Sequence, residues 1–105
     1  MIIVIDLSES RVLLQDPADF TRFSVATEGD GDLAEVMRQS GLGRLKDDGE
    51  HVVVDPVALR ALAGPAATGG WEDGFAGMCE YAAGRGWIEA DGGIVAHIER
   101  RDESG

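Results

Sequence analysis

The sequence predicts an α+β fold in which three short helices combine with β-hairpins and N-terminal strands. Residues 71–85 carry apolar side chains at helical spacing, and residues 87–98 then read as a two-stranded hairpin around an Asp-Gly-Gly turn. Residues 2–7 are β-branched and almost continuously apolar, which is typical of a strand covered on both faces. Helical and strand patterns thus follow one another within one short chain, which favours a mixed fold.

The size and composition of the chain indicate one small, acidic domain. Its 105 residues fit a single domain, and a hydrophobic fraction of 44% is enough to build a core. The 20 acidic residues outnumber the 9 basic ones, so the net charge is -11. Such a surface repels phosphate backbones and anionic lipids, so we expect neither nucleic-acid nor membrane binding. We expect residues 1–100 to form the globular domain and residues 101–105 a flexible polar tail.

Other features are typical of a cytoplasmic protein. The single cysteine, Cys79, allows no internal disulfide, which fits a reducing compartment. Residues 1–5 are apolar but lack a basic leader and end at Asp6, so no signal peptide is expected. No run approaches the ~18 apolar residues that a membrane span requires. The expected location is therefore the cytoplasm.

In the N-terminal half, strands are expected to precede the first helix. A second strand is predicted over residues 12–14, and a third within 20–27, where apolar and polar residues alternate. Asp32 followed by Glu35 resembles a capping box, and a narrow apolar stripe follows it. The first helix is therefore expected over residues 33–41.

In the C-terminal half, a hairpin and two helices are expected before the final hairpin. An Asp-Gly turn near residue 48 predicts a hairpin that ends at residues 51–54. Asp55-Pro56 then predicts a helix over 56–63, because aspartate caps a helix well and proline loses nothing at its first position. The third helix, 71–85, contains glycines that weaken it, so its stability must come from packing.

From residue 31 onward, the expected elements follow one another as helix, strand, helix, helix and hairpin. The run Glu80–Ile88 ends a helix in an arginine–glycine step and enters the first strand of the hairpin. In this order and local pattern, residues 31–99 resemble a winged helix-turn-helix domain. The resemblance implies that residues 71–85 are the recognition helix and that 87–99 are the wing. Residues 1–27 lie outside it.

The charge of the third helix departs from that of DNA-binding winged helices, which usually present basic and amide side chains there. This helix carries three acidic residues against Arg85 alone. Each neutralised phosphate adds to DNA affinity, so one arginine is too few for a phosphate-facing surface. A dimeric winged-helix regulator that contacts DNA through Arg85, Arg100 and Arg101 is the alternative hypothesis.

No residue pattern predicts a catalytic, cofactor or metal site. Cys79 lies on the apolar face of the third helix and is interpreted as a core side chain. His51 and His97 are the only histidines, and with Cys79 they lack the spacing of a zinc site. A two-residue turn in the final hairpin would place Trp87 on the face of Ile94 and His97 on the opposite face. We therefore expect no enzymatic activity.

The predicted function is a non-catalytic interaction domain in a regulatory or accessory role, which binds a protein partner or a second copy of itself. The edges of the two hairpins could extend a sheet, and aromatic side chains anchor many interfaces. Trp71 is either half exposed or a lid on the core. The candidate interaction residues are Trp71, Tyr81, Arg85 and Trp87. A small-ligand or enzymatic domain with a pocket near His97 and Cys79 is the second alternative.

Overall fold

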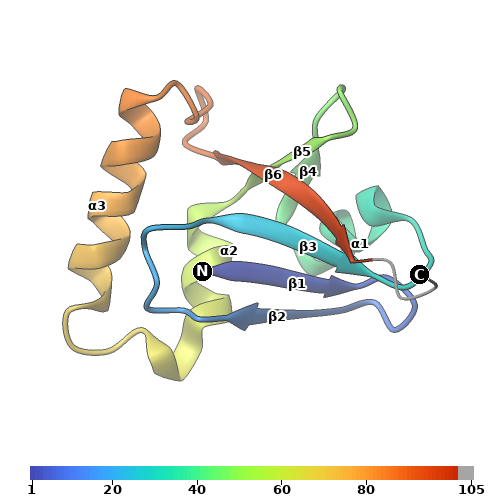
Figure 1. Ribbon diagram of the computed structural model, residues 1–105, viewed down its shortest axis with the longest axis horizontal. Coiled ribbons are helices and arrows are strands. Elements are labelled where there is room, and N and C mark those ends of the chain that lie inside the picture. The colour runs from blue at the N-terminus through green and yellow to red at the C-terminus, as the bar shows by residue number, and fades with distance from the viewer. Residues whose placement is uncertain (102–105) are drawn as a thin grey trace.

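The computed structural model describes residues 1–101, in which three helices pack on a curled six-stranded sheet (Figure 1). The strands are β1 (Ile2–Asp6), β2 (Arg11–Gln15), β3 (Ser24–Glu28), β4 (Gly43–Leu45), β5 (His51–Val54) and β6 (Ile94–Arg101). The helices are α1 (Leu33–Ser40), α2 (Pro56–Ala63) and α3 (Trp71–Gly84), and a short 3₁₀ turn, η1 (Gly64–Ala66), follows α2. The α+β fold class predicted from the sequence is confirmed.

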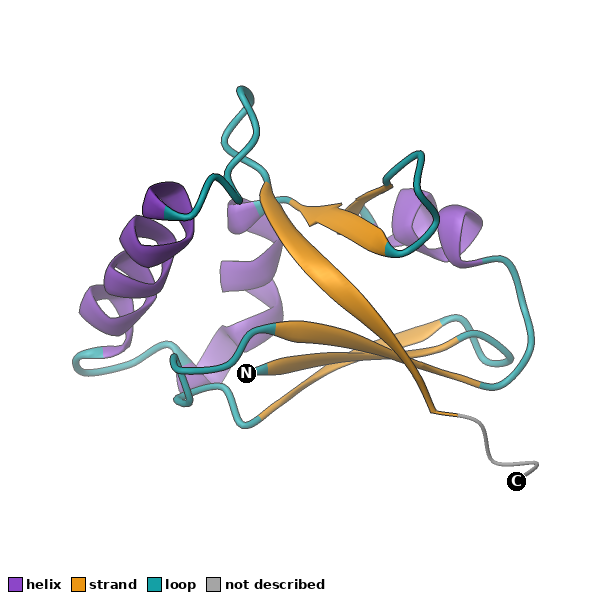
Figure 2. Ribbon diagram, turned by 45° about the horizontal axis from the view of Figure 1, so that its top comes forward, coloured by secondary structure: helices purple, strands orange, loops and turns teal. Residues whose placement is uncertain are grey.

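The long strand β6 joins the two halves of the sheet. The strand order is β2-β1-β3-β6-β5-β4, with antiparallel hairpins at both edges and parallel pairing of β3 with β1 and with β6. Residues 94–97 of β6 pair with β5, and residues 98–101 pair with β3. Figure 2 shows β6 as the strand that crosses diagonally from one half to the other. Side chains on β5 and on the N-terminal half of β6 are therefore neighbours.

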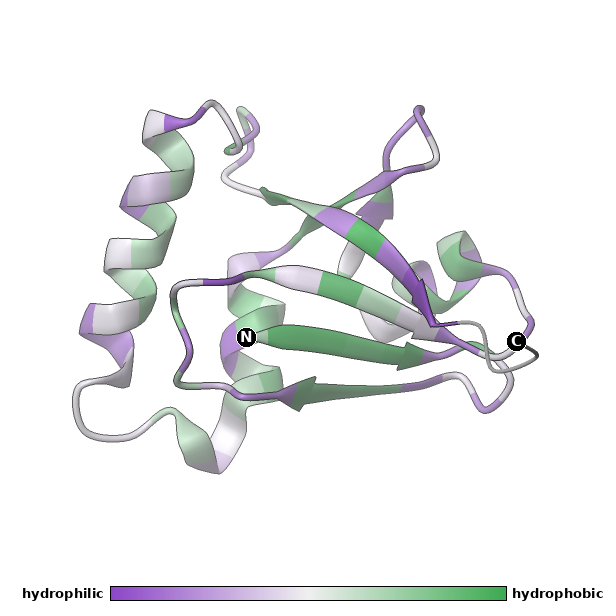
Figure 3. Cartoon of the chain, viewed as in Figure 1, coloured by the Kyte–Doolittle hydropathy of each residue, from purple (hydrophilic) through white to green (hydrophobic). Residues whose placement is uncertain are grey.

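The core lies where the helices meet the sheet. In β1, Ile3, Val4 and Ile5 are all buried, so this strand is covered on both faces, as predicted. Figure 3 shows β1 as a hydrophobic strand along most of its length, between β2 and β3. The largest fully buried side chains come from every part of the described chain: Met1, Ile3, Ile5, Val25, Met37, Val52, Val53, Val54, Leu59, Phe75 and Ile94.

The helix starts follow the capping residues that the sequence indicates. The Asp55 carboxylate accepts a hydrogen bond from the Val57 amide at 2.9 Å, and Pro56 is the first residue of α2. The Asp32 carboxylate accepts one from the Glu35 amide at 3.3 Å. The Glu35 side chain does not return to the amide of Asp32, because it pairs with Arg38 in the same helix. Only half of the predicted capping box is therefore formed.

The C-terminal hairpin differs from the prediction. Residues 87–90 are not a strand, and Ile88 makes only an isolated bridge with Ile94. Five residues separate Ile88 from Ile94 in the chain, whereas the sequence predicted a turn of two residues. Within this turn, the Glu89 amide donates to the Gly93 carbonyl at 2.9 Å. An odd number of turn residues reverses the alternation of side chains. The prediction that Trp87 shares the face of Ile94 is wrong.

Two further boundaries differ from the expected ones. The third strand begins at Ser24, so Phe20 and Phe23 belong to the loop before it. Strand β6 continues to Arg101, whose Nη1 lies 3.4 Å from Glu28 Oε2 on the neighbouring strand. The expected tail began at residue 101, and its residues 102–105 lie outside the described residues.

From α1 onward, the elements are α1, β4, β5, α2, η1, α3 and β6, so the expected sequence of helices is present but the expected final hairpin is not. The expected first strand of the wing is replaced by the turn before β6, and β6 pairs on its other side with the added N-terminal strands. The resemblance to a winged helix stays a prediction. Within residues 1–101, no helix has both the length and the apolar character to cross a membrane.

Two glycines of α3 are expected to respond in opposite ways to replacement by alanine. A Cβ at Gly77 meets no atom within 4 Å, so Gly77→Ala should stabilise the protein by about 1 kcal/mol through helix propensity. A Cβ at Gly74 would lie 2.3 Å from the Phe20 ring, so the crowding should outweigh that gain and destabilise by about 1 kcal/mol. Urea unfolding of both variants checks this. Stabilisation by Gly74→Ala would contradict the packing of Phe20 on α3.

Candidate functional site

Three of the four candidate interaction residues gather at the C-terminal end of α3. Tyr81 and Trp87 are 61% and 43% exposed, and their ring centroids lie 6.2 Å apart at an interplanar angle of 72°. The Arg85 Cζ lies 5.7 Å from the Tyr81 centroid and 5.2 Å from the Trp87 centroid. Contacts of a guanidinium with an aromatic ring at exposed sites contribute about 0.5–1 kcal/mol each, so they favour this arrangement of the three side chains. We call Tyr81, Arg85 and Trp87 the aromatic surface.

The way in which α3 ends positions Trp87. The Trp87 amide donates to the Ala82 carbonyl at 2.8 Å, and the Gly86 amide donates to the Ala83 carbonyl at 3.1 Å. These two bonds, with Gly86 at φ +77°, form a Schellman motif, which turns the chain back over the last turn of its helix. The local sequence Arg85-Gly86-Trp87 therefore brings Trp87 back beside α3, and the Trp87 carbonyl in turn accepts a hydrogen bond from the Val95 amide at 2.8 Å.

Trp71 is not part of the aromatic surface. Its side chain is only 4% exposed, and its indole N–H donates to the Pro17 carbonyl at 2.8 Å. The ring stacks on Phe75 at a centroid distance of 5.0 Å and meets Phe20 edge-on at 5.8 Å. The hypothesis of an exposed Trp71 is therefore wrong, and the residue is a lid on the core.

Two small cavities adjoin Trp87. A cavity of about 70 Å³ lies between α3, the loop before β3 and the start of β6. Its lining residues are Phe20, Thr21, Phe23, Met78, Tyr81, Ala82, Trp87, Ile94 and Val95. A second cavity of about 180 Å³ is lined by Phe23, His51, Trp87, Val95 and His97. Trp87, Phe23 and Val95 belong to both cavities, so one apolar strip connects the aromatic surface to the two histidines.

His51 and His97 lie opposite each other in the register of β5 and β6. Their ring centroids are 5.3 Å apart. This proximity could not be read from the sequence, because it depends on which strands pair and in which register.

The amide of Glu50 and the ring of His51 hold the pKa of Asp48 below its ordinary value, so this carboxylate is ionised at neutral pH.

A larger cleft lies elsewhere, between the end of α1, strand β4 and the start of α2, with a volume of about 410 Å³. Two arginines line it, but Arg38 pairs with Glu35, and Arg44 lies 2.8 Å from Asp91. The amide of Gly93 and the guanidinium of Arg44 lower the pKa of Asp91, which keeps that carboxylate charged. Both arginines of this cleft are thus paired with carboxylates, and its lining residues do not indicate a class of ligand.

Cys79 is partly buried on α3. Burial raises the pKa of its thiol, and the nearby Arg60 lowers it by less. The thiolate is the reactive form, so a raised pKa makes the folded thiol slow to react. Within residues 1–101, no three His, Cys, Asp or Glu side chains gather closely enough to hold a metal ion together.

We expect Cys79 to react with a disulfide reagent such as Ellman's reagent several times more slowly in the folded protein than in guanidinium chloride. The difference should narrow as the pH rises toward the thiol pKa, because the thiolate fraction grows in the folded state. Absorbance at the reagent's thiolate band measures both rates. Equal rates in the folded and unfolded protein would contradict the burial of this thiol.

The exposed sheet edges differ partly from the expected ones. Strand β2 forms one edge, where Leu13 is exposed, and β4 forms the other, where it packs beside α1. The second edge had been expected in the final hairpin, but β6 lies inside the sheet between β3 and β5. Among the strands of residues 1–101, β2 is the one that presents a five-residue edge.

No protein-family model, curated protein or solved structure matches this chain.

Proposed function

We propose that this domain binds a protein partner through the aromatic surface and acts as a non-catalytic regulatory or accessory module. The observation that carries the proposal is the exposure of two large aromatic rings, Tyr81 and Trp87, both of which Arg85 contacts. Tryptophan, tyrosine and arginine are the residue types most enriched among those that dominate binding energy at protein interfaces. The three side chains thus form a small, preorganised anchor.

The anchor is suited to binding because little entropy is lost when a partner covers it. Each ring has only two side-chain torsions, and the cation–π contacts already restrict them. Next to Trp87, the cavity of about 70 Å³ is lined mainly by apolar side chains, including Phe20 and Met78. An apolar side chain of the partner can enter there while its backbone crosses the exposed rings.

The charge of the domain favours a basic partner over a second copy of the same chain. Two copies would each bring a net charge of -11, and their mutual repulsion opposes self-association. A partner with a basic surface would instead be attracted over a long range, and salt would weaken that attraction. A reducing, cytoplasmic location is part of the proposal, because Cys79 is a free thiol.

The DNA-binding alternative has less support. The guanidinium of Arg85 lies over aromatic rings, and that of Arg101 lies 3.4 Å from Glu28. Two of the three arginines that would contact phosphate are therefore already engaged. Phosphate binding requires several cationic side chains that are free to contact phosphate, and these two arginines do not supply them.

The test is affinity capture from native lysate with the wild-type chain, with Trp87→Ala and with Val57→Ala as the matched control. Val57 is an apolar residue of α2 that is 68% exposed and lies outside the aromatic surface. Half of each sample is treated with nuclease. We expect one partner that survives nuclease, remains with Val57→Ala and binds Trp87→Ala about 30-fold more weakly, the effect of a 2 kcal/mol anchor.

Three outcomes would overturn the proposal. Equal capture by all three chains would place the binding site outside the aromatic surface. Capture that disappears with nuclease would favour the DNA-binding alternative. Sedimentation that shows a dimer broken by Trp87→Ala would identify a second copy as the occupant of the aromatic surface.

A further inference from the structure

The two histidines face each other because of the pairing of β5 with β6. The Ile98 amide donates to the Glu50 carbonyl at 2.9 Å, so these two residues lie opposite each other at a hydrogen-bonding position, although the Glu50 amide itself donates to Asp48. The next pair along an antiparallel ladder, His51 and His97, is then a non-hydrogen-bonded pair, in which side chains approach more closely. Their ring centroids are accordingly only 5.3 Å apart, with an interplanar angle of 73°.

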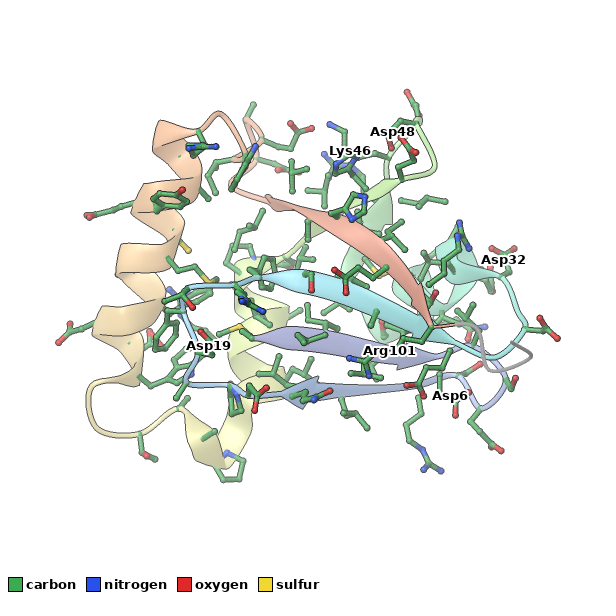
Figure 4. The ribbon with its side chains drawn as sticks, in the orientation of Figure 1. Asp6, Asp19, Asp32, Lys46, Asp48 and Arg101 are labelled. Atoms are coloured by element: carbon green, nitrogen blue, oxygen red, sulfur yellow. The ribbon has the colours of Figure 1, made fainter. Side chains whose placement is uncertain are left out.

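Asp48 orients one of the two imidazole rings. Its Oδ2 lies 2.8 Å from His51 Nδ1, and its Oδ1 accepts the amides of Glu50 and His51 at 2.9 Å and 3.1 Å. Figure 4 shows Asp48 with Lys46 on the β4–β5 hairpin. A carboxylate only accepts, so Nδ1 of His51 is the donor in this hydrogen bond, and Nε2 is the ring nitrogen that can face a metal ion. A carboxylate that orients an imidazole in this way is the usual outer-shell partner of a histidine that binds a metal.

Space for an ion is available beside the imidazoles. The cavity of about 180 Å³ has both histidines in its lining, and the remaining lining residues are Phe23, Trp87 and Val95. None of these three can coordinate a metal, so water would occupy the other coordination positions. The net charge of -11 attracts cations to the domain as a whole.

We propose that His51 and His97 bind one divalent transition-metal ion, of the class Zn²⁺, Ni²⁺ and Cu²⁺, with Asp48 as a positioning residue. Imidazole nitrogen suits these ions, whereas Ca²⁺ and Mg²⁺ require oxygen ligands. Two protein ligands are fewer than the four of a structural zinc site, so the ion keeps positions that are open to exchange. The site is thus a surface site with water-filled positions next to Trp87.

The experiment is isothermal titration of the full chain with NiCl₂, without any partner. We expect one ion per chain for the wild type and loss of that binding in His51→Gln and in His97→Gln. Asp48→Asn should weaken binding by about 10- to 100-fold, the usual effect of an outer-shell carboxylate. Asp91→Asn is the matched control, because it removes a carboxylate from a neighbouring turn that does not contact the histidines, and it should bind Ni²⁺ like the wild type.

A second measurement remains informative if a variant folds poorly. In the NMR spectrum of the wild type, paramagnetic Ni²⁺ should broaden first the signals of His51, His97 and Val95. Broadening that begins at acidic surface residues, or unchanged titrations in both histidine variants, would overturn the proposal. Trp87→Ala should still bind Ni²⁺, so failure of the metal site and failure of the aromatic surface are distinguishable.

Discussion

Trp71→Ala is expected to lower the free energy of unfolding by about 3–5 kcal/mol, the range for large aromatic residues removed from a core. The ring is 4% exposed, stacks on Phe75 and meets Phe20 edge-on. Its indole N–H also binds the Pro17 carbonyl, which ties the loop before β3 to α3. Alanine would lose the packing, leave a cavity and release that loop.

The measurement for this variant is urea denaturation followed by circular dichroism, because removal of Trp71 also changes the fluorescence. Trp71→Phe is the conservative control. It keeps a stacked ring, loses the hydrogen bond to Pro17 and some packing, and should cost about 1–2 kcal/mol. A loss below about 1 kcal/mol for Trp71→Ala, less than core truncation costs, would contradict the role of this residue as a lid.

Features that depend on neighbours in the sequence could be predicted. The start of α2 follows from Asp55-Pro56, and the capping interaction is present in the structure. The aromatic surface is equally local, since Tyr81, Arg85 and Trp87 are brought together by one helix and its Schellman motif. The cap of α2 and the Schellman motif are determined within a few residues, which is why they could be predicted locally.

Features that depend on distant segments could not be predicted. The buried indole of Trp71 donates its hydrogen bond to the Pro17 carbonyl, which lies 54 positions away. The contact between His51 and His97 requires the register of β5 on β6. A turn of five residues, instead of two, placed Trp87 on the face of Val95, and the sequence contains no signal for its length. In each case, the position of the side chain depends on contacts between segments that are far apart in the sequence, which a local pattern does not contain.

Gly43→Ala is expected to destabilise the protein by about 3 kcal/mol, the upper range for overpacking. Gly43 opens β4 directly after α1, and a Cβ at this position would lie 1.8 Å from the backbone carbonyl oxygen of Val53. Side chains can move away from a new methyl group, but Val53 is held in β5 between its partners Arg44 and Val95. The strand itself would therefore have to move.

The control for this variant is Gly41→Ala, two residues earlier. Gly41 has φ +70° as the C-cap of α1, and a Cβ there meets no atom within 4 Å. It should cost only about 1–2 kcal/mol, from the left-handed conformation alone. The two unfolding free energies, measured in urea, separate crowding from backbone strain. Equal losses in the two variants would show that β4 can move away from β5 at little cost.

Movement of β5 would also shift His51 relative to His97, so Gly43→Ala should weaken Ni²⁺ binding, whereas Gly41→Ala should leave it unchanged.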